Sequence, residues 1–149
     1  MKLVFVITCF LLPLTANADD LNSSPQDKLV GTWVVPADED NRSALTFNAD
    51  GTFELVATDP EAPQRVIGQA SGTYKVDFTV SPAHLDLDAR IRKPKHEEPV
   101  KRTFEMIIQM IDTNRFRISS VGLPERPKAF GKQSHVMQRQ LTPPADADK

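Results

Sequence analysis

The sequence predicts an all-β fold, an eight-stranded antiparallel up-and-down barrel with a short N-terminal helix. Eight short segments alternate apolar and polar residues with a period of two, and residues typical of turns separate them. No segment is typical of a helix long enough for the crossover that parallel strands need. Closure of eight strands into a barrel removes exposed sheet edges, which favours a barrel. A two-sheet sandwich of the same strands is the competing prediction.

The N-terminus has the pattern of a cleavable signal peptide. Lys2 precedes an apolar run over residues 3–14, and residues 15–18 end in a small-x-small site. Twelve helical residues span about 18 Å, less than the roughly 30 Å hydrocarbon core of a bilayer. We therefore expect cleavage after Ala18 and a periplasmic or secreted protein without a transmembrane anchor. An uncleaved anchor is the alternative.

The remainder of the chain is predicted to form one domain with polar flanks. Ser24 and Pro25 are typical of a helix start, and Gly31 limits the helix to a turn or two. The only cysteine, Cys9, falls within the expected signal, so the mature chain has no disulfide and no thiolate metal ligand. The expected divisions are a signal peptide at 1–18, a polar segment and helix start at 19–28, the barrel domain at 29–141 and a disordered tail at 142–149.

The strands follow from the alternation, and Asp50-Gly51 supplies the turn between the second and third. The predicted strands are residues 32–35, 43–48, 52–58, 68–76, 84–91, 102–111, 114–119 and 134–139. Bulky side chains dominate the predicted inner face, which favours a small cavity or none. The candidate ligand-binding residues on that face are Phe47, Phe53, Tyr74, Leu87, Phe104 and Phe116.

The opening Leu29-Val30-Gly31-Thr32-Trp33 resembles the Gly-x-Trp start of lipocalins and the wider calycin superfamily. More narrowly, the chain resembles a small lipocalin-like domain of exported bacterial proteins, often of unknown function. The resemblance implies that Arg139 covers Trp33 and closes one end of the barrel, and that the interior takes a small ligand. The further matching stretches are residues 45–47, 50–51, 72–74, 82–87, 115–118 and 126–130.

The charge of the chain is unevenly distributed. Residues 19–61 carry 10 acids and 2 bases, whereas residues 90–139 carry 12 bases and 5 acids. Neighbouring strands of opposite charge explain this distribution, and an acidic partner is the alternative. Arg92, Lys93 and Lys95 in a basic loop are the candidate residues for such a partner. The slightly acidic chain as a whole gives no support for nucleic-acid binding.

No motif of catalysis or metal binding stands out. His84, His96 and His135 lie on separate segments without the spacing of a zinc site. Asp86 and Asp88 share a face but alternate with leucines, which places them on the outer surface. We therefore predict no catalytic residue, no metal and no cofactor.

Two functions stay open at this point. The first is an exported barrel that binds a small apolar or amphipathic ligand. The second is a periplasmic protein-interaction or envelope accessory module with a filled core and charged loops, which binds no ligand. The fold alone does not choose between them.

Overall fold

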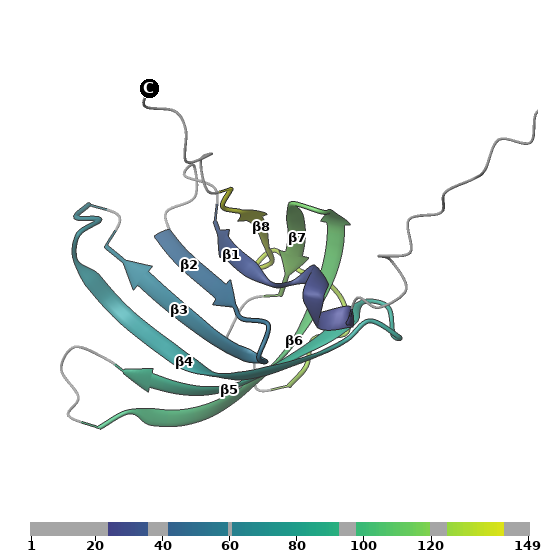
Figure 1. Cartoon of the computed structure of the whole chain (residues 1–149), viewed down its shortest axis with the longest axis horizontal. Helices are drawn as coiled ribbons and strands as arrows, with labels where there is room; N and C mark the ends of the chain where they lie inside the picture. Colours follow the sequence, from purple (N-terminus) through teal and green to yellow (C-terminus); the bar gives the residue numbers. More distant parts are fainter. Residues whose placement is uncertain (1–23, 36–41, 60, 93–97, 120–124, 142–149) are drawn as a thin grey trace, which may run out of the picture.

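Each strand pairs antiparallel with its neighbours in sequence, and the last strand pairs with the first, so the sheet closes into a barrel (Figure 1). The computed structural model describes residues 24–35, 42–59, 61–92, 98–119 and 125–141. The predicted up-and-down barrel is confirmed, and a sandwich is excluded. The strands are β1 (Gly31–Val34), β2 (Arg42–Phe47), β3 (Thr52–Thr58), β4 (Val66–Asp77), β5 (Ala83–Arg92), β6 (Val100–Asp112), β7 (Arg115–Ile118) and β8 (His135–Arg139).

Alternating apolar side chains form one core inside the barrel. In β5, Leu85, Leu87 and Ala89 are buried, whereas Asp88, between Leu87 and Ala89, is exposed. Successive side chains of a strand point to opposite faces, so one apolar face per strand is enough to fill the interior. The largest fully buried side chains are Trp33, Phe47, Phe53, Phe116, Leu29, Leu85, Met106, Ile107 and Ile108.

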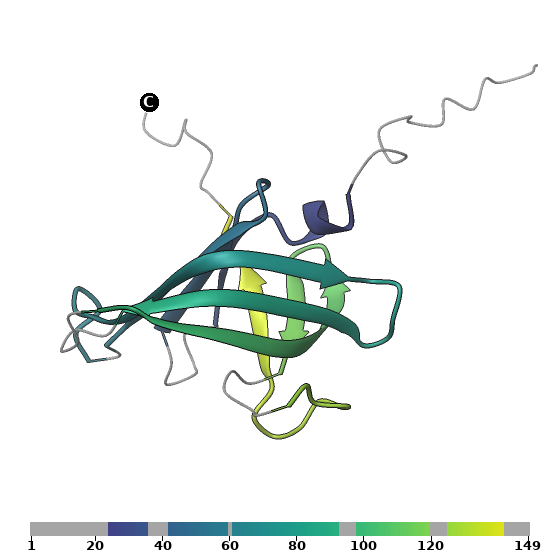
Figure 2. The ribbon, with the colours of Figure 1, turned by 90° about the horizontal axis from the view of Figure 1, so that it is seen from below.

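The strands differ in length, and this gives the barrel two unlike ends. β4 has 12 residues and β6 has 13, but β1 and β7 have 4 each. β7 pairs with β6 only from Ile108 onward, so the first half of β6 has β5 as its one partner. The long strands β4, β5 and β6 therefore extend beyond the short strands, as Figures 1 and 2 show.

The predicted N-terminal helix is a single 3-10 turn, η2 (Pro25–Lys28), and not an α-helix. The Ser24 side chain accepts from the Gln26 backbone N–H, and the Asp27 carboxylate accepts from the Ser24 N–H at 2.6 Å. Leu29 is already buried after this turn, and β1 begins at Gly31. The chain thus has no room for the second turn that an α-helix needs.

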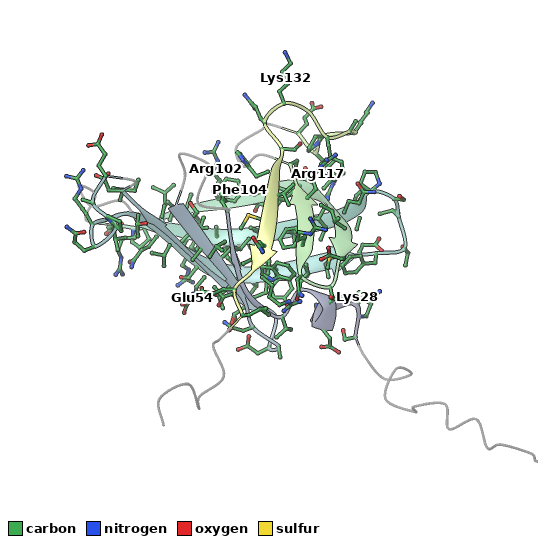
Figure 3. The ribbon with its side chains drawn as sticks, turned by 90° about the horizontal axis from the view of Figure 1, so that it is seen from above. Lys28, Glu54, Arg102, Phe104, Arg117 and Lys132 are labelled. Atoms are coloured by element: carbon green, nitrogen blue, oxygen red, sulfur yellow. The ribbon has the colours of Figure 1, made fainter. Side chains whose placement is uncertain are left out.

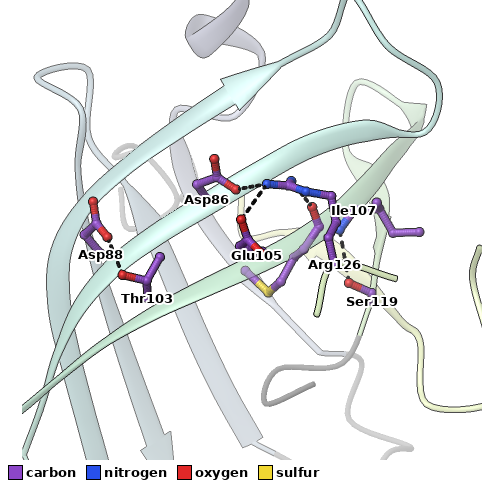
Figure 4. Close-up of polar contacts among 8 residues, drawn as sticks. Asp86, Asp88, Thr103, Glu105, Ile107, Ser119 and Arg126 are labelled. Atoms are coloured by element: carbon purple, nitrogen blue, oxygen red, sulfur yellow. Dashed lines mark hydrogen bonds and ion pairs between the residues drawn. The ribbon is translucent and has the colours of Figure 1, made fainter. Parts of the chain in front are cut away.

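The described part of the connection between β7 and β8 contacts the outer face of β5 and β6 through Arg126 (Figure 4). Arg126 pairs with Asp86 and Glu105 and donates to the Met106 carbonyl at 3.0 Å. Ile107 lies between two inward residues of β6, yet it is 1 % exposed. Ser119 and Arg126 contact the backbone at Ile107 and Met106, so the described part of the connection lies beside this buried outward position.

The same outer face accounts for the two carboxylates of β5. Asp86 is the ion-pair partner of Arg126, and Asp88 accepts from the Thr103 hydroxyl at 2.8 Å (Figure 4). Ser119 is buried and accepts from the Ile107 N–H at 3.1 Å. These contacts hold neighbouring strands and the connection together.

Candidate functional site

One end of the barrel, called the closed end below, is filled by Trp33, Phe47, Tyr74 and Phe116. The rings of Trp33 and Phe116 meet edge to face at 4.6 Å between centroids, and those of Phe47 and Tyr74 at 4.7 Å. The Trp33 indole donates to the Leu29 carbonyl at 2.7 Å. Every ring here is at most 2 % exposed. The closed end therefore has no space for a ligand.

The polar groups of this end are satisfied from within the fold. The Tyr74 hydroxyl donates to the Asn48 carbonyl at 3.0 Å. Burial raises the pKa of Tyr74 above its ordinary value, with a smaller contribution from the acids Asp27 and Asp50. Tyr74 is therefore a neutral donor near pH 7, which suits a structural role.

Arg139 caps the closed end from outside. Its guanidinium lies 4.2 Å from the centroid of the Trp33 ring. It donates to the carbonyls of Val30, of Lys28 at 3.0 Å and of Thr113 at 3.2 Å. This is the arrangement that the lipocalin resemblance implies for the pair. A Cβ atom at Gly31, whose φ is +127°, would lie 2.6 Å from an Arg139 nitrogen, so glycine leaves room for the cap.

An apolar cavity of about 210 Å³ lies inside the barrel, toward the ends of the long strands. This end is called the open end below. Apart from Gln69, the lining is apolar. The lining residues are Leu45, Phe53, Leu55, Ala57, Gly68, Gln69, Ala70, Leu87, Ala89, Ile91, Phe104, Met106 and Ile118.

The cavity separates the six candidate ligand-binding residues into two groups. Phe53, Leu87 and Phe104 line it, whereas the other three belong to the packed closed end. Phe104 is partly exposed and lies on the half of β6 that, among the described strands, pairs with β5 alone. The sequence missed Leu55, Ala57 and Ile91 as candidates, although their inward alternation was a usable signal.

Strand pairing assigns the mouth of the cavity to two exposed residues of β6 that pair with lining residues but are not lining residues themselves. Val100 pairs with Ile91 across β5 and β6 and is 53 % exposed. Arg102 pairs with Ala89 and is also exposed. Its guanidinium carbon lies 5.5 Å from the centroid of the Phe104 ring, and both residues are labelled in Figure 3.

The outer face of β3, β4 and β5 carries a polar groove of about 380 Å³. Its charged lining residues are Glu54, Arg90 and Arg92. A second hollow of about 540 Å³ shares Arg90 and reaches Lys101 on β6. The candidate partner residue Arg92 is thus placed on the outer face, whereas Lys93, Lys95 and the neighbouring His96 lie outside the described residues.

Within the described part of the chain, no group of three histidine, cysteine or acidic side chains is close enough to hold a metal ion. In that same part, no helix has the length and apolar character to cross a membrane. The segment predicted to be a signal peptide, most of the predicted polar N-terminal segment and the predicted tail fall outside the residues that the structure describes.

A comparison with protein families gives one match. The family described as Domain of unknown function (DUF3994) matches residues 17–118, from before η2 to the end of β7. No curated protein and no solved structure matches the chain.

Proposed function

The chain belongs to the family described as Domain of unknown function (DUF3994), and because that description states no activity, we propose a function from the barrel itself: it binds a small apolar or amphipathic ligand at its open end. The apolar cavity carries this proposal. Burial of apolar surface in such a cavity is favourable by about 25 cal/mol per Å². The resemblance to small lipocalin-like domains supports the same kind of function.

The cavity volume limits the ligand. An engineered apolar cavity of about 150 Å³ stays dry and binds benzene, whereas pockets for drug-sized ligands begin near 300 Å³. At about 210 Å³, this cavity accommodates a single ring or part of an alkyl chain. Larger ligands would have to leave most of their surface in solvent.

The closed end supports a single direction of entry. The edge-to-face rings and the Arg139 cap block access from that side. An apolar group that enters at the open end would pass Ala57 and Ile91, next to the ends of β3 and β5, and then reach Phe53, Leu87 and Phe104. Any polar part of the ligand would stay at the mouth, in contact with water.

Calorimetric titration with 1-hexanol, 1-octanol and 1-decanol tests the proposal. Each methylene that enters the cavity contributes about 0.8 kcal/mol, or roughly fourfold in affinity, until the cavity is full. We expect a rise from hexanol to octanol and a plateau after it. Absence of heat and of any competition with an apolar fluorescent dye for all three alcohols would reject the function.

A matched pair of variants locates the site. Ala57 lines the cavity, and Val56 next to it lines the outer groove. Ala57→Phe is expected to fill the cavity and to weaken octanol binding by about tenfold or more, because the ligand loses its buried methylenes. Val56→Phe should bind octanol as the unmodified protein does. Equal binding by both variants, with unchanged melting temperatures, would place the ligand elsewhere.

We further propose that the protein is exported and begins at Asp19 after processing, on the support of the N-terminal sequence pattern. The mass and N-terminal sequence of the protein from its native host test this. A chain that retains residues 1–18 in the envelope fraction, or that stays in the cytoplasm, would be incompatible with it.

A second candidate function is interaction with an acidic protein partner at the outer groove and at the second hollow, which shares Arg90 with it. Arg90, Arg92 and Lys101 supply positive charge there, and Glu54 and Asp88 partly offset it. Reversal of the three basic residues to glutamate should abolish co-purification of such a partner and leave octanol binding intact. Retention of the partner by the reversed variant would exclude the groove.

A further inference from the structure

We propose that the ligand of the open-end cavity is an anionic amphiphile, and that Arg102 at the mouth contacts its acidic head group. The inference rests on the proposed function, because it assigns the head group of the same ligand whose apolar part enters the cavity. The chemistry at issue is a carboxylate or a phosphate on a short alkyl chain.

Strand register places Arg102 on the cavity side of the barrel. It pairs with Ala89 and lies two residues before Phe104 in β6. Cross-strand partners share a face, and so do residues two apart in one strand. Ala89 and Phe104 both line the cavity. Arg102 is not itself a lining residue and also borders the second hollow of the outer face, but this pairing places its side chain on the inward side of β6, beside the cavity wall and exposed to solvent.

The guanidinium is held over an aromatic ring of the cavity wall. Its central carbon lies 5.5 Å from the centroid of Phe104, within the range of a cation–π contact (Figure 3). A stacked guanidinium keeps its edge N–H donors available, and these match the two oxygens of a carboxylate or phosphate. The contact thus orients a positive donor group beside the apolar opening.

The surroundings of Arg102 differ from those of three described arginines and match those of Arg90, Arg92 and Arg117, which likewise form no ion pair with a described carboxylate. Arg65, Arg115 and Arg126 each form an ion pair with an aspartate. Among the residues that the structure describes, no carboxylate forms an ion pair with Arg102. A positive charge without an internal partner at an apolar mouth favours an anionic head group and disfavours an ammonium.

Three ligands with the same chain isolate the head group: 1-octanol, octanoate and octylamine, with octyl phosphate as a second acid. We expect both acids to bind the full chain about two- to fivefold more tightly than octanol at low salt, the range of an exposed ion pair, and octylamine to bind least. The preference should shrink in 0.5 M salt, because exposed charges are screened. Comparison of the two acids shows whether carboxylate or phosphate fits better.

A pair of variants assigns the effect to one side chain. Arg102→Gln is expected to bring octanoate affinity down to the octanol affinity of the same variant. Arg117→Gln is the control, since Arg117 is exposed on β7, with its guanidinium 5.6 Å from the Phe130 ring. That control should retain the full preference for octanoate. Circular dichroism of both variants checks that the barrel is intact.

The outcomes separate this inference from the function on which it rests. If octanol, octanoate and octylamine bind equally well, the head-group assignment is overturned and ligand binding stands. If Arg102→Gln still prefers acids, the head-group assignment is also overturned, because a group other than Arg102 must then contact the acid. If none of the ligands binds, the proposed function itself is lost.

Discussion

Replacement of Arg139 by methionine tests how much the closed end contributes to stability. The substitution removes a cation–π contact worth about 1 kcal/mol at a partly desolvated site. It also removes three hydrogen bonds to carbonyls, each worth about 1 kcal/mol at most when water replaces the donor in part. Methionine keeps the apolar stem over Trp33. We therefore expect a loss of about 2–4 kcal/mol in unfolding free energy, which lowers the melting temperature by roughly 8–16 °C.

Thermal and urea unfolding followed by circular dichroism measure this loss. Arg117→Met is the matched control, because Arg117 also lies over an aromatic ring but is exposed on β7. The control should lose no more than about 0.5 kcal/mol. If both variants unfold at the temperature of the unmodified protein, the reasoning about the Arg139 cap is refuted.

Three further predictions concern the strands and turns that hold the barrel together. Gly72→Ala should destabilise the fold by about 3 kcal/mol or more, because its Cβ would lie 1.8 Å from the Asp88 carbonyl oxygen; Gly68→Ala, with no atom within 4 Å, should stay within about 0.5 kcal/mol of the unmodified protein in urea unfolding. Arg126→Met should lower the unfolding free energy by about 1–2 kcal/mol and speed proteolysis between β7 and β8, and an unchanged digestion rate would show that the ion pair does not hold the connection. Hydrogen bonds from the Thr79 hydroxyl and N–H hold the pKa of Asp77 below its usual 3.8. The ionised Asp77 therefore contributes fully to the unfolding free energy above about pH 5, and this contribution is lost as the pH falls below 3.8. Asp77→Asn should reduce the loss of stability between these pH values, as measured by urea unfolding across the acid range.

The barrel was predictable because period-two alternation records burial directly. On β5, Leu87 and Ala89 are buried, and Asp88 between them is exposed. Because the turns are short, consecutive strands pair antiparallel. An open sheet of these strands would leave two unprotected edge strands, and closure into a barrel removes both edges. The N-terminal helix was less predictable, because its length depended on how soon Leu29 became buried.

The ligand site was predictable only in part, because alternation gives the face of a residue but not its height along the barrel. Phe47 and Phe53 are cross-strand partners with inward side chains, yet Phe53 reaches the cavity and Phe47 packs against Tyr74. The tilt of the strands decides which inward residues lie at the closed end and which line the cavity. Tilt is a property of the closed sheet, so the pattern of a single strand does not give it.

Two residues show what else the pattern left out. Arg102 occupies an inward position of β6 two residues before Phe104, and extending the alternation by one step would have found it. Ile107 occupies an outward position and is nevertheless buried, at the point where Ser119 and Arg126 contact the backbone of Ile107 and Met106. No local pattern predicts where a long connection folds back.

A crystal structure of the protein with bound octanoate would show whether the apolar cavity inside the barrel holds the alkyl chain. We predict that the alkyl chain lies against Phe53, Leu87 and Phe104, with the carboxylate toward the open end. A chain bound on the outer face, or an interior in which side chains fill the cavity and octanoate is absent, would contradict the account.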